Sequence, residues 1–425
     1  MAGPTLRVWV GRRRAVRAPS PNPPELHWTD ARDVPPGPWL RLCALGAVAA
    51  GAAAVASGEL GLAHRALVLV ALPPLAALVA AARFAHPALR APAYTALGAF
   101  LAATAAWWSQ PLHVGLAALS LAATAVAAAV SFRGERVSGG PLRDYVTLTK
   151  PRIMSLLLLT GAAGMFVGAG GVPPLADLGV LLVGLGLACG GASALNHVLD
   201  RDIDRLMGTR TERRPVASGR VPPARALEFG LALSALSFVL LASLANVLTA
   251  LLALAGNLFY VLVYTGWLKR STPQNIVVGG AAGAVPPLVG WAAATGNLTL
   301  PALFLFLVVF VWTPPHFWAL ALLIRRQYEA AGVPMLPVVR GERETTRQIV
   351  LYTVGLVALT LAPLAWGMFG AVYLVAAVAL GAGFLLLAWR LRREPTPGRA
   401  ALVFHYSLAY LALLFVAMAV DPLVV

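Results

Sequence analysis

The sequence contains few charged residues: Asp, Glu, Lys and Arg make up 12% of its 425 residues, whereas a soluble domain carries about 25%. It also contains only two cysteines, Cys43 and Cys189, and each lies in a separate apolar run. They therefore indicate neither a disulfide framework nor a metal site. The start of the chain has no apolar segment of the kind found in a cleavable signal peptide. These absences argue against a soluble globular domain and against a secreted disulfide-rich protein.

Apolar residues are abundant instead and account for 59% of the chain. Runs of about 18 residues recur, each long enough to cross about 30 Å of hydrocarbon as a helix. The predicted fold class is all-α, a polytopic membrane helical bundle, because a membrane barrel would show short alternating strands. Four early spans are expected at about 39–57, 66–83, 92–108 and 113–132. Nine more are expected at about 153–171, 176–195, 226–245, 246–266, 276–294, 301–324, 347–368, 370–390 and 401–420.

A charged stretch after the fourth span predicts a domain boundary. Residues 1–38 are basic and rich in proline, and we expect a disordered cytoplasmic tail there. Residues 39–132 are expected to form a four-helix membrane accessory domain, and 133–147 a linker. Residues 148–425 then form the main domain, which contains the nine later spans.

The distribution of basic residues predicts how the chain crosses the membrane. The net charge is +16, and nearly all Arg and Lys of the main domain lie in the loops at 196–225, 267–275, 325–347 and 390–400. By the positive-inside rule, these loops and the N-terminus are cytoplasmic and the C-terminus is outside. We therefore expect a multi-pass protein of the plasma membrane, with the lipid bilayer as a partner and not nucleic acid.

The stretch NHVLDRDIDRLMGTRTERRP, residues 196–215, concentrates charge directly after an apolar span. Asn196, Asp200 and Asp204 are spaced i, i+4, i+8, so on a helix they lie on one face, about 6 Å apart along the axis. That spacing suits one or two Mg²⁺ ions bridging to a diphosphate. We predict these three residues as metal ligands and catalytic residues. The alternative is a solvated helix end with surface ion pairs, but ionisable groups at membrane depth are by default functional.

Basic residues from three cytoplasmic loops are expected to contact the diphosphate. Arginines bind phosphate oxygens bidentately, which favours this role for those that follow the acidic motif. For the pair in the loop at 264–275, ordinary positive-inside anchoring is an equal alternative. Asp202 lies off the motif's face, and we expect it to pair with Arg201 or Arg205. The predicted diphosphate contacts in these loops are Arg210, Arg213, Arg214, Lys269, Arg270, Arg326 and Tyr328.

The pattern N-x-x-x-D-x-x-x-D at residues 196–204 resembles the first aspartate motif of the UbiA superfamily of intramembrane prenyltransferases. Four further blocks, in the right order, are similar to the protoheme IX farnesyltransferases, or heme O synthases, within it. The blocks are LTKPRI at 148–153, YTGWLKRSTPQNIVVGGAAGAVPPLVGWAA at 264–293, WTPPHFWALAL at 312–322 and YEAAGVPMLPVV at 328–339. The resemblance covers about residues 141–422.

The resemblance implies a reaction: the farnesyl group of farnesyl diphosphate is transferred to a vinyl group of heme b, with water addition, to give heme O. It implies Mg²⁺ as cofactor, and heme A synthase, which would act next, as a further partner. Lys150 and Arg152 match the family's K-P-R sequence and are expected to contact the diphosphate. One position departs from the pattern: Gln327 stands where the family often has Asp, and the nearest acid is Glu329. We therefore expect the first motif to carry most of the metal binding.

His316 lies in WTPPHFW, inside an apolar span and just after two prolines. A proline-loosened segment can line a cavity, and imidazole is a common iron ligand, so His316 is a candidate heme contact. The alternative is a core histidine bonded to a carbonyl that the prolines free. The four early spans resemble half of a heme A synthase, but Glu59 and His64 are five apart and do not meet that family's Glu-x-x-His-Arg pattern. A generic apolar anchor is the favoured interpretation.

Two other functions stay open on the sequence. One is a different prenyltransferase of the superfamily, acting on a quinone precursor or chlorophyllide, which the WTPPHFW and PQNIVVGG blocks argue against. The other is an ion-coupled membrane transporter whose carboxylates relay ions. A transporter would show internal repeats with corresponding broken helices, and the sequence has no such repeat.

Overall fold

The computed structural model describes residues 38–56, 62–84, 89–105, 141–363 and 367–424, with isolated positions at 120, 123, 124 and 127. Within these residues every regular element is a helix. The early helices are α1 (Pro38–Ala56), α2 (Leu62–Phe84) and α3 (Arg90–Ala105). The main domain contains α5 (Leu142–Leu148), α6 (Pro151–Ala169), α7 (Leu175–Leu199), α8 (Arg201–Leu206), α9 (Thr209–Glu212), α10 (Pro223–Leu244), α11 (Val247–Leu258), the π-helix η3 (Phe259–Leu268), α12 (Lys269–Ser271), α13 (Asn275–Thr295), α14 (Leu300–Leu323), α15 (Arg325–Ala330), α16 (Leu336–Val339), α17 (Gly341–Leu361), α18 (Ala371–Arg393) and α19 (Pro397–Val424).

Eight helical segments in the described residues are long and apolar enough to cross a membrane. They are α6, α7, α10, the continuous segment from α11 to α12, α13, α14, α18 and α19, and they match eight of the nine predicted spans of the main domain to within a few residues. The ninth predicted span, 347–368, corresponds to α17, whose first turns carry Glu342, Arg343, Glu344 and Arg347. The predicted tail and most of the fourth early span, 113–132, lie outside the described residues.

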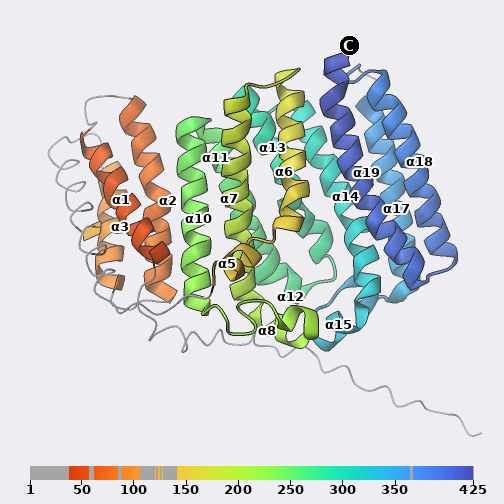
Figure 1. The fold of residues 1–425 in the computed structure, drawn as a ribbon, viewed down its shortest axis with the longest axis horizontal. Helices are drawn as coiled ribbons and strands as arrows, with labels where there is room; N and C mark the ends of the chain where they lie inside the picture. The colour runs from red at the N-terminus through yellow and green to blue at the C-terminus, as the bar shows by residue number, and fades with distance from the viewer. Residues whose placement is uncertain are drawn as a thin grey trace, which may run out of the picture.

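The charged loops of the main domain meet at one end of the bundle. Helices α7, α12 and α14 end there, α10, α13 and α17 begin there, and α18 and α19 join there. Figure 1 shows α8, α12 and α15 at this end, with the C-terminus of the chain at the other. The prediction that these loops share one face is therefore confirmed. The opposite connections, such as 170–174 and 296–299, carry no charge.

The contact between α6 and α13 brings two helix backbones unusually close. A Cβ atom added at Gly290 of α13 would overlap the carbonyl oxygen of Gly161 in α6, and one at Gly164 would overlap that of Pro287. Without a hydrophobic driving force in lipid, helices gain contact energy through such close approach of small residues. These glycines therefore fix α13 against α6, and with it the position of the neighbouring η3.

The early helices pack against the main domain through α10. Cys43 of α1 and Ala77 of α2 join a buried cluster with Ala235 of α10. The ring of Trp39 lies 4.9 Å from that of Phe229 and 6.0 Å from that of Tyr145. The part of the predicted linker from Leu142 onwards is the helix α5. In Figure 1 the helices α1 to α3 lie on the α10 side of the bundle and α17 to α19 on the far side.

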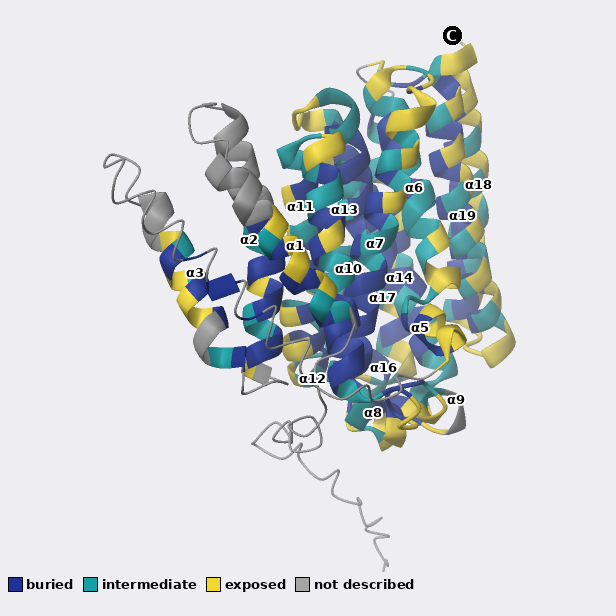
Figure 2. Ribbon diagram, turned by 60° about the vertical axis from the view of Figure 1, so that its left-hand side comes forward, coloured by how far each residue is buried: buried dark blue, intermediate teal, exposed yellow. Residues whose placement is uncertain are grey.

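Buried residues concentrate on the helices at the centre of the bundle, such as α7, α13 and α14, and exposed residues on outer faces such as that of α18 (Figure 2). Exposed apolar side chains on the outer helices, including Leu386 and Leu402, are what a lipid-facing surface requires. The central helix α7 carries the acidic motif at its charged end.

Candidate active site

The three residues of the acidic motif lie at the junction of α7 and α8. Asn196 is in the last turn of α7, Asp200 follows its end, and Asp204 is in α8. The backbone N–H of Asp200 donates to the carbonyl of Asn196, and that of Asp204 to the carbonyl of Asp200, both at 2.8 Å. The helical ladder thus continues through the break. The side chains are only 3%, 1% and 1% exposed, so the solvated helix end considered from the sequence is wrong.

Asn196 and Asp200 form one hydrogen-bonded unit with two lysines. The Lys150 ammonium donates to Asn196 Oδ1 at 2.7 Å, and Asn196 Nδ2 donates to Asp200 Oδ2 at 2.8 Å. Lys269 Nζ donates to the same oxygen of Asp200 at 2.5 Å. Asn196 Nδ2 also donates to the Thr265 hydroxyl at 3.1 Å. Residues 46 and 69 positions apart along the chain therefore meet around this asparagine and this carboxylate.

Asp204 has a cation of its own. Arg214 Nη1 donates to Asp204 Oδ1 at 2.6 Å. The carboxylate is buried and the guanidinium is partly exposed. Burial raises the pKa of Asp204 above its ordinary value, although the charge and hydrogen bond of Arg214 oppose the shift. Three cations therefore surround two carboxylates, and the centre carries an excess of positive charge that suits an anionic ligand.

Lys150 is held in an unfavourable backbone conformation. Its φ of 50° and ψ of 60° lie in the left-handed region, and it is the one non-glycine residue with positive φ among the described positions. Such a conformation persists only where the surroundings enforce it, and it clusters at functional sites. Burial and the charge of Arg214 lower the pKa of Lys150 to about 7, although Asp200 favours its charged form. Both the backbone conformation of Lys150 and the charge on its side chain are therefore unfavourable at this position.

The π-helix η3 contains Thr265 and leads directly into Lys269, the first residue of α12. Segments of π-helix are rare and occur frequently at functional sites. A Cβ atom at Gly279 of α13 would overlap the ring of Tyr264, so the glycine leaves room for that ring beside the helix. The rings of Tyr260 and Tyr264 stack with their centroids 5.6 Å apart. Helix α13 therefore supports the wide turns of η3 from behind.

Two buried carboxylate oxygens have no partner among the described residues: Asp200 Oδ1 and Asp204 Oδ2. Oxygens of this kind are costly to bury unpaired, which marks them as candidate ligands of a metal ion. The described residues contain no cluster of three or more His, Cys, Asp and Glu that would form a complete metal cage. Two carboxylates nevertheless fit Mg²⁺, which is bound through one or two carboxylates plus substrate phosphates and waters.

Asp202 and Arg270 pair with each other, which corrects the expected partners of Asp202. The Arg270 guanidinium donates to both Asp202 oxygens at 2.7 Å and to the carbonyl of Leu199 at 2.7 Å. Although burial opposes it, this bidentate contact holds the pKa of Asp202 below its ordinary value. Arg205 donates instead to the carbonyl of Ala217 at 2.9 Å. Arg270 thus locks α12 onto the α7–α8 junction, and its use as a phosphate contact stays a prediction.

Other predicted diphosphate contacts lie at the surface of the charged end. Arg152, Arg213 and Arg326 are exposed. Arg210 belongs to α9, but its side chain lies outside the described part of the structure. The structure therefore brings Lys150, Lys269 and Arg214 to the carboxylates and leaves the others around the rim.

The second motif is helical, as α15, and only its tyrosine faces inward. Tyr328 is 7% exposed, whereas Gln327 and Glu329 on either side of it are exposed. Burial raises the pKa of Tyr328, while the charges of Lys269 and Arg214 oppose the shift. The phenol is therefore close enough to the centre to interact electrostatically with it. Neither Gln327 nor Glu329 joins the buried carboxylates.

His316 is buried in α14 with a hydroxyl partner. Its Nδ1 lies 2.7 Å from the Ser407 hydroxyl of α19. Its ring stacks on Trp312 at 4.4 Å and on Phe404 at 4.9 Å between centroids. The partner is thus a serine hydroxyl, where the alternative interpretation expected a freed backbone carbonyl. A heme contact for His316 stays a prediction.

Two residues of the centre were not found from the sequence. Thr265 is fully buried and bonded to Asn196, but one threonine in an apolar segment gives no signal. His197 follows Asn196 in α7, is 2% exposed, and neither ring nitrogen has a hydrogen-bond partner in the described residues. Its position beside the motif was visible in the sequence, whereas its burial was not.

Comparison with known proteins identifies the main domain. Residues 157–416 match the UbiA prenyltransferase family. The chain is 56% identical over 287 residues to the protoheme IX farnesyltransferase of Symbiobacterium thermophilum, a match that covers 67% of this chain and 95% of that protein. It is 53% identical over 283 residues to the protoheme IX farnesyltransferase of a Roseiflexus species, where the match covers 67% of this chain and 53% of that protein. The chain thus spans about half the length of the Roseiflexus relative.

The fold is similar to that of a solved digeranylgeranylglyceryl phosphate synthase. The TM-score is 0.57 at 20% identity, and the match covers 67% of this chain and 99% of that one. At this identity the likeness establishes the fold alone. Taken with the sequence matches, it shows that this chain is a multi-pass membrane enzyme that belongs to the UbiA prenyltransferase family and, within it, to the protoheme IX farnesyltransferases.

Proposed function

We propose that the chain transfers the farnesyl group of farnesyl diphosphate to a vinyl group of heme b, with water addition, and releases heme O and diphosphate. The observation that carries the proposal is the pair of buried, unpartnered oxygens of Asp200 and Asp204 beside three cations. Relatives that are 53–56% identical carry the name of this activity. The family alone would leave the acceptor open.

In the proposed reaction, the bond between C1 of the farnesyl group and the diphosphate oxygen breaks, and the electron pair leaves with the diphosphate. The vinyl π electrons of heme b then form the new carbon–carbon bond to C1. Water captures the resulting cation at the neighbouring carbon and loses a proton, which leaves a hydroxyl group. The leaving group gains negative charge as the first bond breaks, so fixed positive groups lower the barrier.

The chain's own cations are placed for this task. Lys269 and Arg214 now bind Asp200 and Asp204, at 2.5 Å and 2.6 Å. The carboxylates keep both cations at the centre in the absence of an anion. An arriving diphosphate would share these cations with the carboxylates, and Lys150, held on Asn196 at 2.7 Å, would approach from the side of α6. The positions are set before substrate binds, which avoids a reorganisation cost during reaction.

Mg²⁺ is the proposed cofactor, with Asn196, Asp200 and Asp204 as its protein ligands. When bound, it would neutralise charge that develops on the leaving diphosphate. Asp200 Oδ1 and Asp204 Oδ2 are the unpaired oxygens, and Asn196 Oδ1, which accepts one hydrogen bond from Lys150, would contribute its second lone pair. The exposed Gln327 and Glu329 favour a site built mainly by the first motif.

The apolar bundle below the charged end would hold the farnesyl chain and exclude water until the allylic cation is captured. The stacked rings of Tyr260 and Tyr264 in η3 present π faces of the kind that attract cations. We place the charged end in the cytoplasm, the C-terminus outside and the protein in the plasma membrane, from the distribution of Arg and Lys. A heme A synthase that consumes the product is the proposed protein partner.

The decisive experiment incubates the protein in membranes with heme b, farnesyl diphosphate and Mg²⁺, and analyses the pigment by mass spectrometry. The expected product is heme O, with the mass of heme b plus a farnesyl group and one hydroxyl group. Parallel reactions replace heme b with a quinone precursor or chlorophyllide. A prenylated product in those reactions and none with heme b would overturn the assignment of the acceptor.

A further inference from the structure

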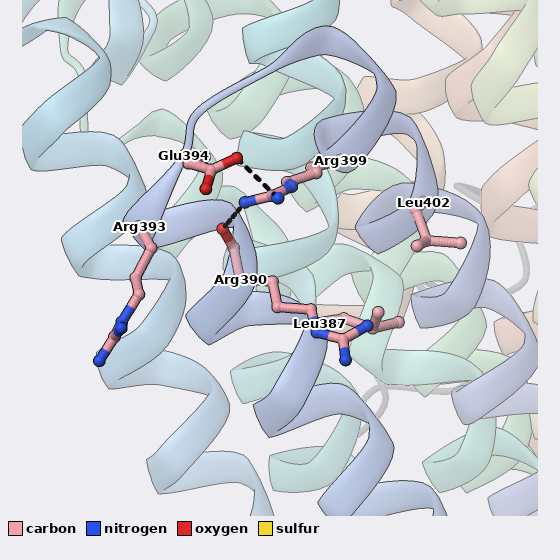
Figure 3. Close-up of a pocket in the computed structure, with 6 residues that line it drawn as sticks. All are labelled: Leu387, Arg390, Arg393, Glu394, Arg399 and Leu402. Carbon is pink, nitrogen blue, oxygen red and sulfur yellow. Dashed lines mark hydrogen bonds and ion pairs between the residues drawn. The ribbon is translucent and has the colours of Figure 1, made fainter.

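A second polar site lies at the charged end of the bundle, where α18 turns into α19. A pocket of about 310 Å³ is lined there by Leu387, Arg390, Arg393, Glu394, Arg399 and Leu402. Figure 3 shows these side chains around the connection between the two helices. None of them belongs to the carboxylate centre, so the pocket is separate from the proposed active site and is not explained by it.

The pocket has an excess of positive charge, because three of its six lining residues are arginines and one is a glutamate. Arg399 neutralises Glu394 through an ion pair of 2.7 Å and donates to the carbonyl of Arg390 at 2.9 Å. Arg399 is therefore fixed at the back of the pocket. Two positive charges, those of Arg390 and Arg393, remain without a counter-charge in the described residues.

These two arginines are held differently. The Arg393 guanidinium lies 5.3 Å from the centroid of the Trp389 ring. The Arg390 guanidinium makes neither a hydrogen bond nor an ion pair with any residue that the structure describes, and Figure 3 shows it beside Leu387. A guanidinium offers five donors in a planar fork that matches phosphate oxygens. The site therefore presents unused donors for a phosphate group.

The surroundings of the pocket are those of a membrane surface. The candidate spans α18 and α19 end and begin at its two sides. Trp389 and Leu402, beside the arginines, are 50% and 52% exposed, and both are apolar. The neighbouring Arg392 donates to the carbonyl of Arg343 at 3.2 Å, which places the pocket at the end that carries the charged loops. A ligand here meets apolar surface on one side and positive charge on the other.

We propose that this pocket binds the phosphate of an anionic phospholipid, with the acyl chains lying along the apolar faces of α18 and α19. Basic pockets between membrane helices at the cytoplasmic side recognise such head groups. Apolar walls beside the arginines favour a phosphate that is attached to a lipid over a free phosphate ion. The proposal does not depend on which acceptor the enzyme prenylates.

The test measures lipid binding by native mass spectrometry, with the full chain and either phosphatidylglycerol or phosphatidylcholine. The Arg390→Gln/Arg393→Gln variant is compared with a control, Arg325→Gln/Arg347→Gln, which removes the same charge from exposed ion pairs at the same end. Each pocket arginine should contribute on the order of fivefold in affinity. We expect phosphatidylglycerol to bind about 25-fold more weakly to the pocket variant and unchanged to the control.

Three outcomes would overturn the proposal. An equal loss of phosphatidylglycerol in the control would show attraction to general surface charge. Equal binding of phosphatidylcholine and phosphatidylglycerol would show that the head group is not recognised. Displacement of the lipid by millimolar inorganic phosphate would assign the pocket to a free anion. An Arg390→Lys/Arg393→Lys variant keeps the charge but loses the planar forks, and should bind more tightly than the glutamine variant and more weakly than the unchanged protein, which separates loss of the site from loss of the fold.

Discussion

Asp144 and Arg220 lie 76 residues apart in the sequence, and their side chains meet through three hydrogen bonds of 3.0–3.2 Å. The same guanidinium donates to the carbonyl oxygen of Arg213 at 3.0 Å. The pair therefore connects α5, the helix that leads into Lys150, with the turn that carries Arg214. Lys150 and Arg214 both belong to the carboxylate centre. Neither Asp144 nor Arg220 touches that centre.

Asp144→Asn should raise the KM for farnesyl diphosphate by about fivefold, with a smaller change in kcat, because it loosens the positions of Lys150 and Arg214. Steady-state kinetics in lipid vesicles would measure this split. Asp144→Glu should recover most of the affinity. Glu344→Gln, which breaks an exposed pair with Arg347 at 3.3 Å, is the control. An equal rise in KM in the control would contradict a positioning role.

Asp200→Asn and Asp204→Asn should each lower farnesyl transfer by at least about a hundredfold, because the leaving group loses its charge stabilisation. Heme b binding, followed by an absorbance titration, should persist, since these acids serve the diphosphate. Glu342→Gln is the matched control, because that carboxylate forms an exposed ion pair with Arg325 at 3.3 Å. Normal turnover in either variant, or full activity in excess chelator, would remove the metal site.

Glu329→Gln should reduce the rate by at most about tenfold, equivalent to about 1.4 kcal/mol in the barrier. Glu329 is exposed on α15, whereas the neighbouring Tyr328 is buried toward the centre. Gln327→Asp should be tolerated or mildly activating. The test compares the turnover number of Glu329→Gln with that of Asp200→Asn. If the two variants are equally inactive, Glu329 is a principal metal ligand.

Deletion of residues 1–138 should leave farnesyl transfer measurable but lower the melting temperature. The residues of the centre all lie in the main domain, and the match to the Symbiobacterium relative covers 95% of that protein. Stability should fall because Trp39 no longer covers Phe229 and Tyr145. Trp39→Ala in the full chain should shift the melting temperature in the same direction by less. A truncated protein that folds in membranes without transferring farnesyl would make the early helices part of the catalytic unit.

The sequence was sufficient to predict eight spans of the main domain and the acidic motif, because both depend on short-range patterns. Apolar runs mark those eight spans to within a few residues, and a four-residue spacing places Asn196, Asp200 and Asp204 together. For the basic residues that contact these carboxylates, the sequence indicated only the loops in which they lie. Which of them reaches a carboxylate depends on how the helices pack, and local spacing carries no information about that.

The partner of Asp202 illustrates the limit. Arginines one and three residues away were the natural candidates, but the observed partner, Arg270, lies 68 residues further on. The left-handed backbone of Lys150 and the π-helical turns of η3 could not be predicted from the sequence either, because tertiary contacts impose them against local preference. The contact of α1 and α2 with α10 could not be predicted either, since apolar residues cover all sides of a membrane helix.

The π-helix also makes the centre sensitive to how its helix is wound. A π-helical turn accommodates a residue more than an α-helical turn does, so η3 behaves like an insertion within an otherwise regular helix. If η3 wound into α-helical turns with all its residues kept, everything after it would rotate by about 100°. Lys269 would then turn away from Asp200, while the hydropathy of the span would not change. A change of helix type that is silent for membrane insertion would thus be decisive for catalysis.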